Sequence, residues 1–382
     1  MSTNYLRTSE RNLFKRCQWA WERNYIDRLE PRKRHSPALW FGTGIHLALE
    51  HWYVPGTERG RDPIETWNEY CDESEANTDY INTYANGDFS EAVEARELGI
   101  DMLQGYLATY GDEPWMDVIS SELTFQVPLK HDQWVLAEDQ YFVMIGDKEE
   151  TSTTYVGTFD LVYRDTRDGK LYVLDHKTAR ALGSANTQYL PLDDQAGAYW
   201  AMAVFTLREQ GLIGPDEVLT GIVYNYLVKS KSDKRPRNKD GLATNNPQKK
   251  HYLAALEHLE IEGLDKLKID ELKLKAEEHD IEVFGEVSSR QPTKAFERVV
   301  VRKNKRQQFR QIKRMLQDLE AMSLVRNKVV TATKTPTREC SFCPFQNICE
   351  LDEAGRDYSD IQSLLFTTWD PYESHRTEEE AE

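Results

Sequence analysis

An apolar run that ends in two charged side chains constrains this chain more than any other part of its sequence. The run Leu171-Tyr-Val-Leu-Asp-His-Lys177 alternates as a strand does, which places Asp175 and Lys177 on the same face as Leu171 and Val173. Burying a carboxylate and an ammonium is costly unless they pair or bind something such as a metal ion. Gly157-Thr-Phe-Asp160 sets a second acid in a neighbouring strand-like run. Two carboxylates and a lysine on adjacent strands could activate a metal-bound water for phosphodiester hydrolysis, or form a buried ion pair without function.

The bulk composition describes a globular chain of 382 residues, 39% hydrophobic and 30% charged, which is long enough for one to three domains. No apolar stretch approaches the length of a membrane span, and no signal-peptide pattern opens the sequence. We therefore expect a soluble protein of the cytoplasm, or of the host cytoplasm if the source is viral. Five cysteines, an odd number, favour metal chemistry in a reducing compartment over a disulfide framework.

The formal net charge of the whole chain is −17, which disfavours nucleic acid as a partner because phosphate binding needs a positive surface. Two segments depart from this balance. Residues 229–250 carry eight basic and two acidic side chains, and residues 298–314 carry eight basic and no acidic ones. Each segment is interpreted either as a solvated loop or helix surface or as part of a focused groove for an anionic ligand.

Periodicity and turn signals divide the chain into a central run of strands between helical ends. Helices are predicted at 9–28, 37–53, 62–76, 90–110, 188–209, 251–279 and 304–328. Strands are predicted at 118–129, 133–146, 153–164, 170–177, 217–228 and 295–302. The pattern predicts an α/β fold with a helical annex built from both ends of the chain.

A cysteine cluster near the C-terminus, Cys340-Ser-Phe-Cys343-Pro-Phe-Gln-Asn-Ile-Cys349, is the second strong signal and indicates metal ligation. Structural zinc and [4Fe–4S] sites commonly use four ligands, so one is missing. Cys17, on an apolar helical face, is favoured over Cys71, which begins an acidic stretch. Spacing alone does not separate zinc from iron–sulfur.

Four further polar residues, His46, Glu50, Gln195 and Tyr199, are weaker candidates for the site. His46, in Gly42-Thr-Gly-Ile-His46-Leu-Ala-Leu-Glu50, is a lone helical histidine, so a structural role competes with a metal-ligand role, and Glu50 one turn later shares its face. Gln195 and Tyr199 also share one helix face. No Gly-x-x-x-x-Gly-Lys-Ser/Thr occurs, so the chain has no nucleotide-driven motor of this type.

Taken in order along the chain, these motifs resemble those of a RecB-family member of the PD-(D/E)xK nuclease superfamily. The closer resemblance is to its iron–sulfur branch, which includes the AddB nuclease domain and the CRISPR-associated Cas-four exonucleases. The matching motifs are Gly44-Ile-His46, Gly157 to Asp160, Asp175 with Lys177, Gln195 with Tyr199, and the cysteines Cys17, Cys340, Cys343 and Cys349. The chain departs from the superfamily pattern in lacking its proline before the second motif.

The resemblance implies a restriction-endonuclease-like core, a central mixed β-sheet flanked by helices, with a helical iron–sulfur annex. The core would span 37–302, with insertions near 55–117 and 229–295. The annex would combine 1–36 and 303–368, and residues 369–382 would form a disordered acidic tail.

The resemblance also implies a metal site and a cluster. Mg²⁺ or Mn²⁺ would be held by His46, Asp160, Asp175 and the backbone carbonyl of His176. Lys177 would orient the attacking water or stabilise the phosphoryl oxygens, and Gln195 and Tyr199 would position DNA or brace Lys177. The four matched cysteines, Cys17, Cys340, Cys343 and Cys349, would hold a [4Fe–4S] cluster, with Zn²⁺ as the less favoured occupant.

The function implied is a metal-dependent DNA exonuclease that acts on single-stranded DNA or duplex ends in recombination, repair or viral DNA processing. A helicase or recombination protein is the expected partner besides DNA, and no membrane is. The alternative is a non-catalytic or partner-dependent DNA-binding subunit of a helicase–nuclease complex. A zinc-stapled RNA-binding protein is a third hypothesis.

Overall fold

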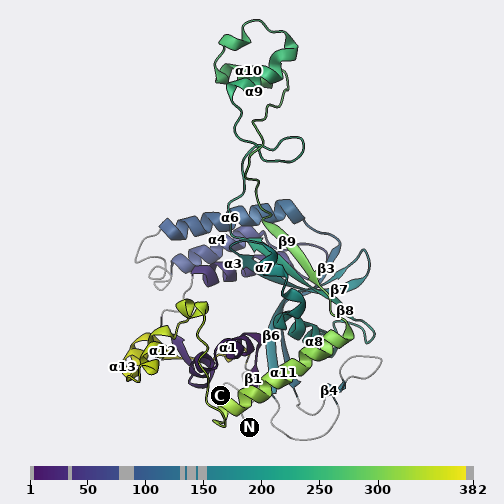
Figure 1. Ribbon diagram of the computed structural model, residues 1–382. Helices are drawn as coiled ribbons and strands as arrows, with labels where there is room; N and C mark the ends of the chain where they lie inside the picture. The colour runs from purple at the N-terminus through teal and green to yellow at the C-terminus, as the bar shows by residue number, and fades with distance from the viewer. Residues whose placement is uncertain are drawn as a thin grey trace. The chain divides into compact units, whose positions relative to one another are not determined.

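The computed structural model describes residues 4–32, 37–76, 90–129, 134–135, 143–144 and 153–375, and it divides into two compact units (Figure 1). Unit 1 comprises residues 1–229 and 296–382, and unit 2 comprises residues 230–295. The insertion expected at 229–295 therefore falls on a separate unit, whereas the segment 55–117 belongs to unit 1.

A six-stranded mixed sheet forms the centre of unit 1. Its strand order is β1 (Asn4–Leu6), β6 (Thr153–Asp165), β7 (Lys170–Ala179), β8 (Leu219–Val228) and β9 (Phe296–Val301), and β3 (Met116–Leu129) also pairs with β6. The pairs β1–β6 and β7–β8 are parallel, and β3–β6, β6–β7 and β8–β9 are antiparallel. Two short strands, β4 (Trp134–Val135) and β5 (Val143–Met144), pair within the predicted strand 133–146, whose other residues lie outside the described ones.

Both faces of the sheet are apolar, and each is covered by helices, which gives the α/β arrangement expected from the sequence. Successive strand residues enter different cores, as Val173 and Leu174 do. The core around Val173 includes residues of α8 (Asp194–Glu209) and α11 (Lys305–Arg326). The core around Leu174 is completed by α3 (Pro37–Trp52), α4 (Pro63–Glu75) and α6 (Ser90–Tyr110). The segment 55–117 is thus part of a structural layer, and the whole fits a restriction-endonuclease-like core.

The two chain ends pack together into a small annex of unit 1. β2 (Leu29–Pro31) pairs antiparallel with β10 (Phe366–Thr368), and Trp19 shares an apolar cluster with Phe345 and Ile348. The other annex elements are α1 (Thr8–Arg16), α2 (Gln18–Trp21), the π-helix η1 (Glu22–Ile26), α12 (Gln346–Glu353) and α13 (Ser359–Leu365).

Unit 2 is a small helical unit with its own apolar core. α9 (Lys249–Leu256) and α10 (Ile269–Glu278) bury Tyr252, Leu256 and Leu272 against each other. The helix predicted at 251–279 is wrong in its middle, because Glu260 and Gly263 adopt left-handed backbone angles, with φ of 53° and 79°, that end α9 and turn the chain.

Three other predicted boundaries differ from the structure for local reasons. The helix predicted at 9–28 is interrupted at Cys17, whose backbone is extended. The helix predicted at 188–209 begins only after Asp193, which caps α8 by accepting a hydrogen bond from the Ala196 amide. The tail expected to be disordered from 369 onward is packed at its start, where Tyr372 is buried and hydrogen-bonds Glu10. Residues 376–382 lie outside the described part of the chain.

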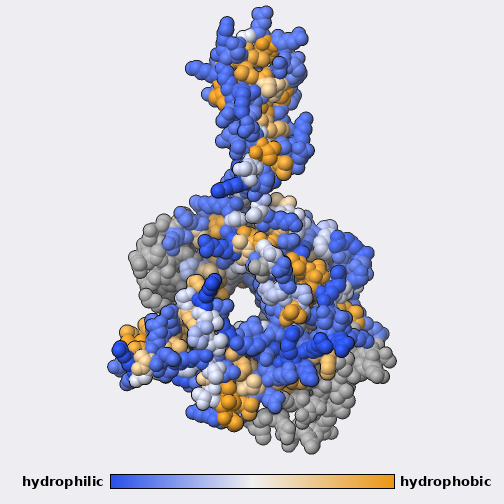
Figure 2. Space-filling view, in the orientation of Figure 1, coloured by the Kyte–Doolittle hydropathy of each residue, from blue (hydrophilic) through white to orange (hydrophobic). Residues whose placement is uncertain are grey.

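Hydrophilic residues cover most of the visible face of unit 1 in Figure 2, with separate hydrophobic patches, and this face is hollowed between the places of α3 and α1. None of the described helices is long and apolar enough to cross a membrane.

Candidate active site

The two central acids lie where β6 and β7 separate. The β6–β7 pairing ends at Leu161 opposite Leu174, so the next residues of β7 keep their β8 partners but have none on the β6 side. Asp160 Oδ2 accepts a hydrogen bond from the His176 backbone amide at 2.7 Å and replaces the missing ladder bond. The divergence of the strands therefore opens a polar notch at Asp160 and Asp175 inside an apolar sheet.

Lys177 is held in this notch by two partners. Its Nζ lies 2.6 Å from Asp175 Oδ2 and donates to Gln195 Oε1 at 3.0 Å. Gln195 Nε2 donates in turn to Asp175 Oδ1 at 2.9 Å and to the Tyr199 hydroxyl at 3.0 Å. The hydroxyl of Tyr199 donates to the Thr158 carbonyl of β6 at 2.7 Å. The contacts made by Gln195 and Tyr199 are thus those of residues that brace Lys177 and Asp175.

A group of three potential ligands converges beside this network. One ligand atom each from His46 on α3, Glu122 on β3 and Asp160 on β6 lies within 4.8 Å of the others, and His46 Nδ1 is 3.3 Å from Asp160 Oδ2. A pocket of about 500 Å³ is lined by His46, Glu122 and Lys177, together with Glu50. Asp175, which was expected to complete the set, is outside this group and faces Lys177 and Gln195 instead.

Sequence reasoning missed Glu122. It is the one acidic residue within 118–129, and it lies between the pairs Ser121–Leu161 and Leu123–Phe159, opposite Asp160. Its φ of 45° is left-handed, a strained conformation for a non-glycine residue in a strand. Such strain is concentrated at functional sites. A lone acid in an otherwise uncharged strand was the available signal, but no family motif pointed to it.

Burial and crowding of negative charge perturb the carboxyl groups of the site. Burial, with Asp175 and Glu122 nearby, raises the pKa of Asp160 well above its usual range. Burial, with Glu50 and Asp175 nearby, raises the pKa of Glu122 to about 7. A divalent cation bound between these carboxylates would remove their mutual repulsion.

The basic groups of the site respond to the same surroundings. Burial lowers the pKa of His46, so its imidazole is neutral and able to ligate a metal at neutral pH. Burial alone would lower the pKa of Lys177, but the Asp175 carboxylate raises it above its usual value, so the ammonium stays charged.

The donor set therefore fits a hard divalent cation: two carboxylates and a neutral imidazole. The buried Asp175 Oδ2 lies 2.6 Å from Lys177 Nζ, so the ammonium balances the charge of this carboxylate beside the donor set.

Two glycines of the sequence motifs position these side chains by close packing. A Cβ on Gly44 would lie 2.5 Å from the rings of Trp67 and Tyr70, so the glycine lets α3, which carries His46, approach α4. A Cβ on Gly157 would lie 2.7 Å from the Phe125 ring, where β3 crosses β6. Each motif glycine is thus explained by a contact near a site residue.

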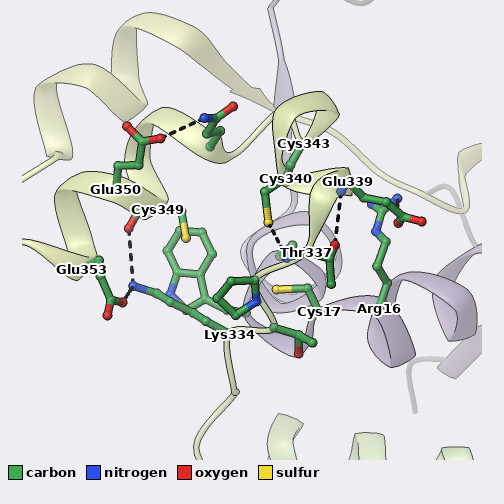
Figure 3. A pocket seen from close by; sticks show the side chains of 15 residues that line it. Arg16, Cys17, Lys334, Thr337, Glu339, Cys340, Cys343, Cys349, Glu350 and Glu353 are labelled. Atoms are coloured by element: carbon green, nitrogen blue, oxygen red, sulfur yellow. Dashed lines mark hydrogen bonds and ion pairs between the residues drawn. The ribbon is translucent and has the colours of Figure 1, made fainter.

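A second pocket, of about 300 Å³, lies in the annex and is lined by Cys17, Cys340, Cys343 and Cys349 (Figure 3). All four thiols are free, and Cys340 Sγ accepts a hydrogen bond from the Thr337 amide at 3.3 Å. Burial raises the pKa of Cys343 and of Cys349, and the neighbouring sulfurs add to this effect. Cys71 is buried in the core around Leu174 instead. The structure thus brings the four expected cysteines to one pocket.

The comparisons with known proteins agree with this geometry at the level of the superfamily. No curated protein matches the chain. The profile of the PD-(D/E)XK nuclease superfamily matches residues 8–350, which include the strands β3, β6 and β7 and the helices α3 and α8 that carry the site residues. Members of this superfamily are metal-dependent nucleases, and the chain belongs to the PD-(D/E)XK nuclease superfamily.

Proposed function

We propose that this protein is a divalent-metal-dependent DNA exonuclease of the RecB-like iron–sulfur branch, acting on single-stranded DNA or duplex ends in recombination, repair or viral DNA processing. The observation that carries the proposal is the convergence of His46, Glu122 and Asp160 beside a lysine braced by Asp175 and Gln195. The choice of exonuclease over endonuclease, and the choice of pathway, rest on the resemblance of the motifs.

In the proposed reaction the residues of the notch divide the work. His46, Glu122 and Asp160 would hold Mg²⁺ or Mn²⁺, and Asp175 and the His176 carbonyl would be the further ligands. When bound, the cation lowers the pKa of a water and neutralises charge on the phosphate. Lys177 would orient that water or stabilise the developing phosphoryl charge, because its ammonium stays protonated in the pocket. An imidazole among the donors favours Mn²⁺ over Mg²⁺, which prefers oxygen ligands.

For the annex pocket we favour a [4Fe–4S] cluster over a zinc ion. Four thiolates around Zn²⁺, at about 2.3 Å each, would place their sulfurs about 3.8 Å apart. Among the described residues, however, the only three or more ligand atoms within 4.8 Å of one another are those of His46, Glu122 and Asp160, so no three cysteine sulfurs are that close. A cavity between thiols that lie this far apart suits a group larger than a single ion.

The cluster would be structural in this proposal. Cys17 comes from one end of the chain and the other three cysteines from the other end, so the four ligands together would tie the annex closed. We place the protein in the cytoplasm, because reduced thiols of this kind persist in reducing compartments.

The test is digestion of linear single-stranded DNA labelled at its 5′ or 3′ end, of duplex DNA and of circular single-stranded DNA, with and without Mn²⁺. We expect linear DNA to be degraded only with metal and circular DNA to survive. Lys177→Met should lower the rate by about 10²–10³-fold, the cost of losing one group that stabilises transition-state charge. Lys170→Met, at an exposed lysine that begins β7, is the matched control and should keep full activity.

Three results would contradict the proposal in different ways. Equal rates for wild type and Lys177→Met would remove the catalytic assignment. DNA binding without cleavage by wild type would favour the non-catalytic subunit of a helicase–nuclease complex. Rapid cutting of circular DNA would replace the exonuclease by an endonuclease.

A further inference from the structure

The N-terminal half of α11 presents a row of cationic side chains on the face opposite the core. Arg306, Arg310 and Lys313 are exposed and follow one another at intervals of four and three residues, so they share one helix face. Ile312 and Met315 are buried on the other face. This row, Arg306, Arg310 and Lys313, is the basic face of α11.

The charges of the basic face are not neutralised within the described part of the chain. No described carboxylate lies within ion-pair distance of Arg306, Arg310 or Lys313, although Arg314 beside them is 3.7 Å from Asp194. The first turn of α11 carries no acidic residue, so Arg306 stands where the helix dipole disfavours a cation, by about 0.3–1 kcal/mol. A protein of net charge −17 that concentrates cations at this point accepts a local cost in stability.

The basic face adjoins the active site through the segment that leads into α8. Lys303 Nζ donates to the Pro191 carbonyl at 2.6 Å, and Arg314 Nη2 donates to the Leu192 carbonyl at 3.3 Å. Leu192 is three residues before Gln195, whose amide oxygen accepts the hydrogen bond from Lys177. Figure 1 shows α11 running beside α8. The cations therefore begin one short segment away from the notch.

Exposed apolar side chains accompany this route. Tyr189 is 52% exposed, Leu192 is 71% exposed, and Phe309, between Arg306 and Arg310, is 37% exposed. Tyr189 is also near enough to Lys177 and Asp175 for their charges to act on its phenol. Aromatic rings interleaved with cations are the combination that binds single-stranded nucleic acid, since bases stack on the rings while phosphates pair with the cations.

We propose that the basic face of α11, with Phe309, Leu192 and Tyr189, is the track along which a single DNA strand reaches the metal site. The inference rests on the proposed nuclease function and adds to it a substrate preference and a binding surface. From Arg306 to Lys313 the face spans about 10 Å of helix, and its three long cationic side chains can each contact a neighbouring phosphate of one strand.

The size of the effect follows from counterion release. For single-stranded DNA, the slope of log affinity against log salt concentration becomes shallower by about 0.7 for each phosphate contact that is removed. Replacing three cations should therefore reduce the slope by about 2 and weaken binding by about 100-fold near 0.1 M salt.

The experiment measures binding of a fluorescent single-stranded oligonucleotide by anisotropy across a salt series, with Ca²⁺ in place of Mn²⁺ to suppress cleavage. The test variant is Arg306→Gln/Arg310→Gln/Lys313→Gln, in which glutamine keeps helix propensity and removes charge. The control with the same charge change is Arg167→Gln/Lys170→Gln/Arg356→Gln, and all three of its positions are exposed.

We expect the test variant to show the reduced slope and the control to keep the wild-type slope. Phe309→Ala should weaken binding without changing the slope. Hydrolysis of bis(p-nitrophenyl) phosphate, which is too small to reach α11, should be the same in wild type and test variant, which shows that the fold and the metal site are intact. The single substitution Arg310→Gln, expected to change the slope by about 0.7, covers the case in which the triple variant does not fold.

A wild-type slope in the folded triple variant would overturn the track while leaving the nuclease proposal standing. Equal competition by a duplex without single-stranded ends would overturn the preference for a single strand. Failure of wild type to cleave or bind any DNA would overturn the nuclease proposal, and the track with it.

Discussion

The pKa of Glu122 makes a quantitative prediction for metal binding. Glu122 lies in the ligand group with a pKa raised to about 7, so its carboxylate is about one-tenth charged at pH 6 and about nine-tenths charged at pH 8. Because a metal binds the deprotonated ligand, this residue alone should strengthen the apparent Mn²⁺ affinity by about 10-fold between pH 6 and pH 8.

Glu122→Gln resembles the protonated side chain at every pH. The variant should therefore bind Mn²⁺ nearly as well as wild type at pH 6 and about 10-fold more weakly at pH 8, a difference of about 1.4 kcal/mol.

The assay is isothermal titration calorimetry with Mn²⁺ in the absence of DNA, at pH 6, 7 and 8. Glu58→Gln, at an exposed position outside the pocket, is the control and should follow wild type. A ratio of affinities near one at all three pH values would refute the assignment of Glu122 as a ligand. A larger difference at pH 6 than at pH 8 would refute the electrostatic reasoning.

Three more predictions follow from the same contacts. Gln195→Leu should lower kcat by about 10-fold or more and leave the Mn²⁺ affinity unchanged, because Lys177 loses a hydrogen-bond acceptor. Steady-state kinetics measures kcat and calorimetry measures the affinity; a change in metal affinity alone would contradict the bracing role. The metal-free protein should lose roughly 2 kcal/mol of unfolding free energy, measured in urea, between pH 5 and pH 8, because a carboxyl group whose folded pKa is raised stabilises the fold only while it is protonated. Saturating Mn²⁺ should remove this loss. An unfolding free energy that rises with pH in the metal-free protein would contradict the raised pKa values. Cys17→Ser should lower Tm and abolish iron absorbance near 400 nm, whereas Cys71→Ser should retain that absorbance; a Cys17→Ser protein with full iron content would exclude Cys17 as a ligand.

Much of the architecture could be predicted because its signals are local. The alternation of 170–177 placed Asp175 and Lys177 on the face covered by α8, and there Gln195 meets both. The strands expected at 118–129 and 153–164 appear with shifts of one or two residues, because long apolar alternation is a strong signal.

The errors arise where a backbone turn or a tertiary contact decides the outcome. The left-handed Glu260 breaks a predicted helix, and the extended Cys17 breaks another. Tyr372 is held by the buried Glu10, which is far away in sequence, so a composition that looked like a disordered tail was misread.

The missed ligand has the same explanation. Glu122 lies next to Asp160 only because β3 pairs with β6 in one particular register, and this register cannot be predicted from the spacing of residues along the chain. Conversely, Asp175 was expected among the ligands by motif, while in the structure its two oxygens face Lys177 and Gln195.

If His46, Glu122 and Asp160 form the site of the catalytic cation, anomalous diffraction from crystals soaked in Mn²⁺ will locate the ion among them. We expect a manganese peak about 2.0–2.4 Å from the His46 imidazole and from both carboxylates, and its loss in Asp160→Asn crystals. A fully occupied manganese site elsewhere, with this group empty, would contradict this assignment.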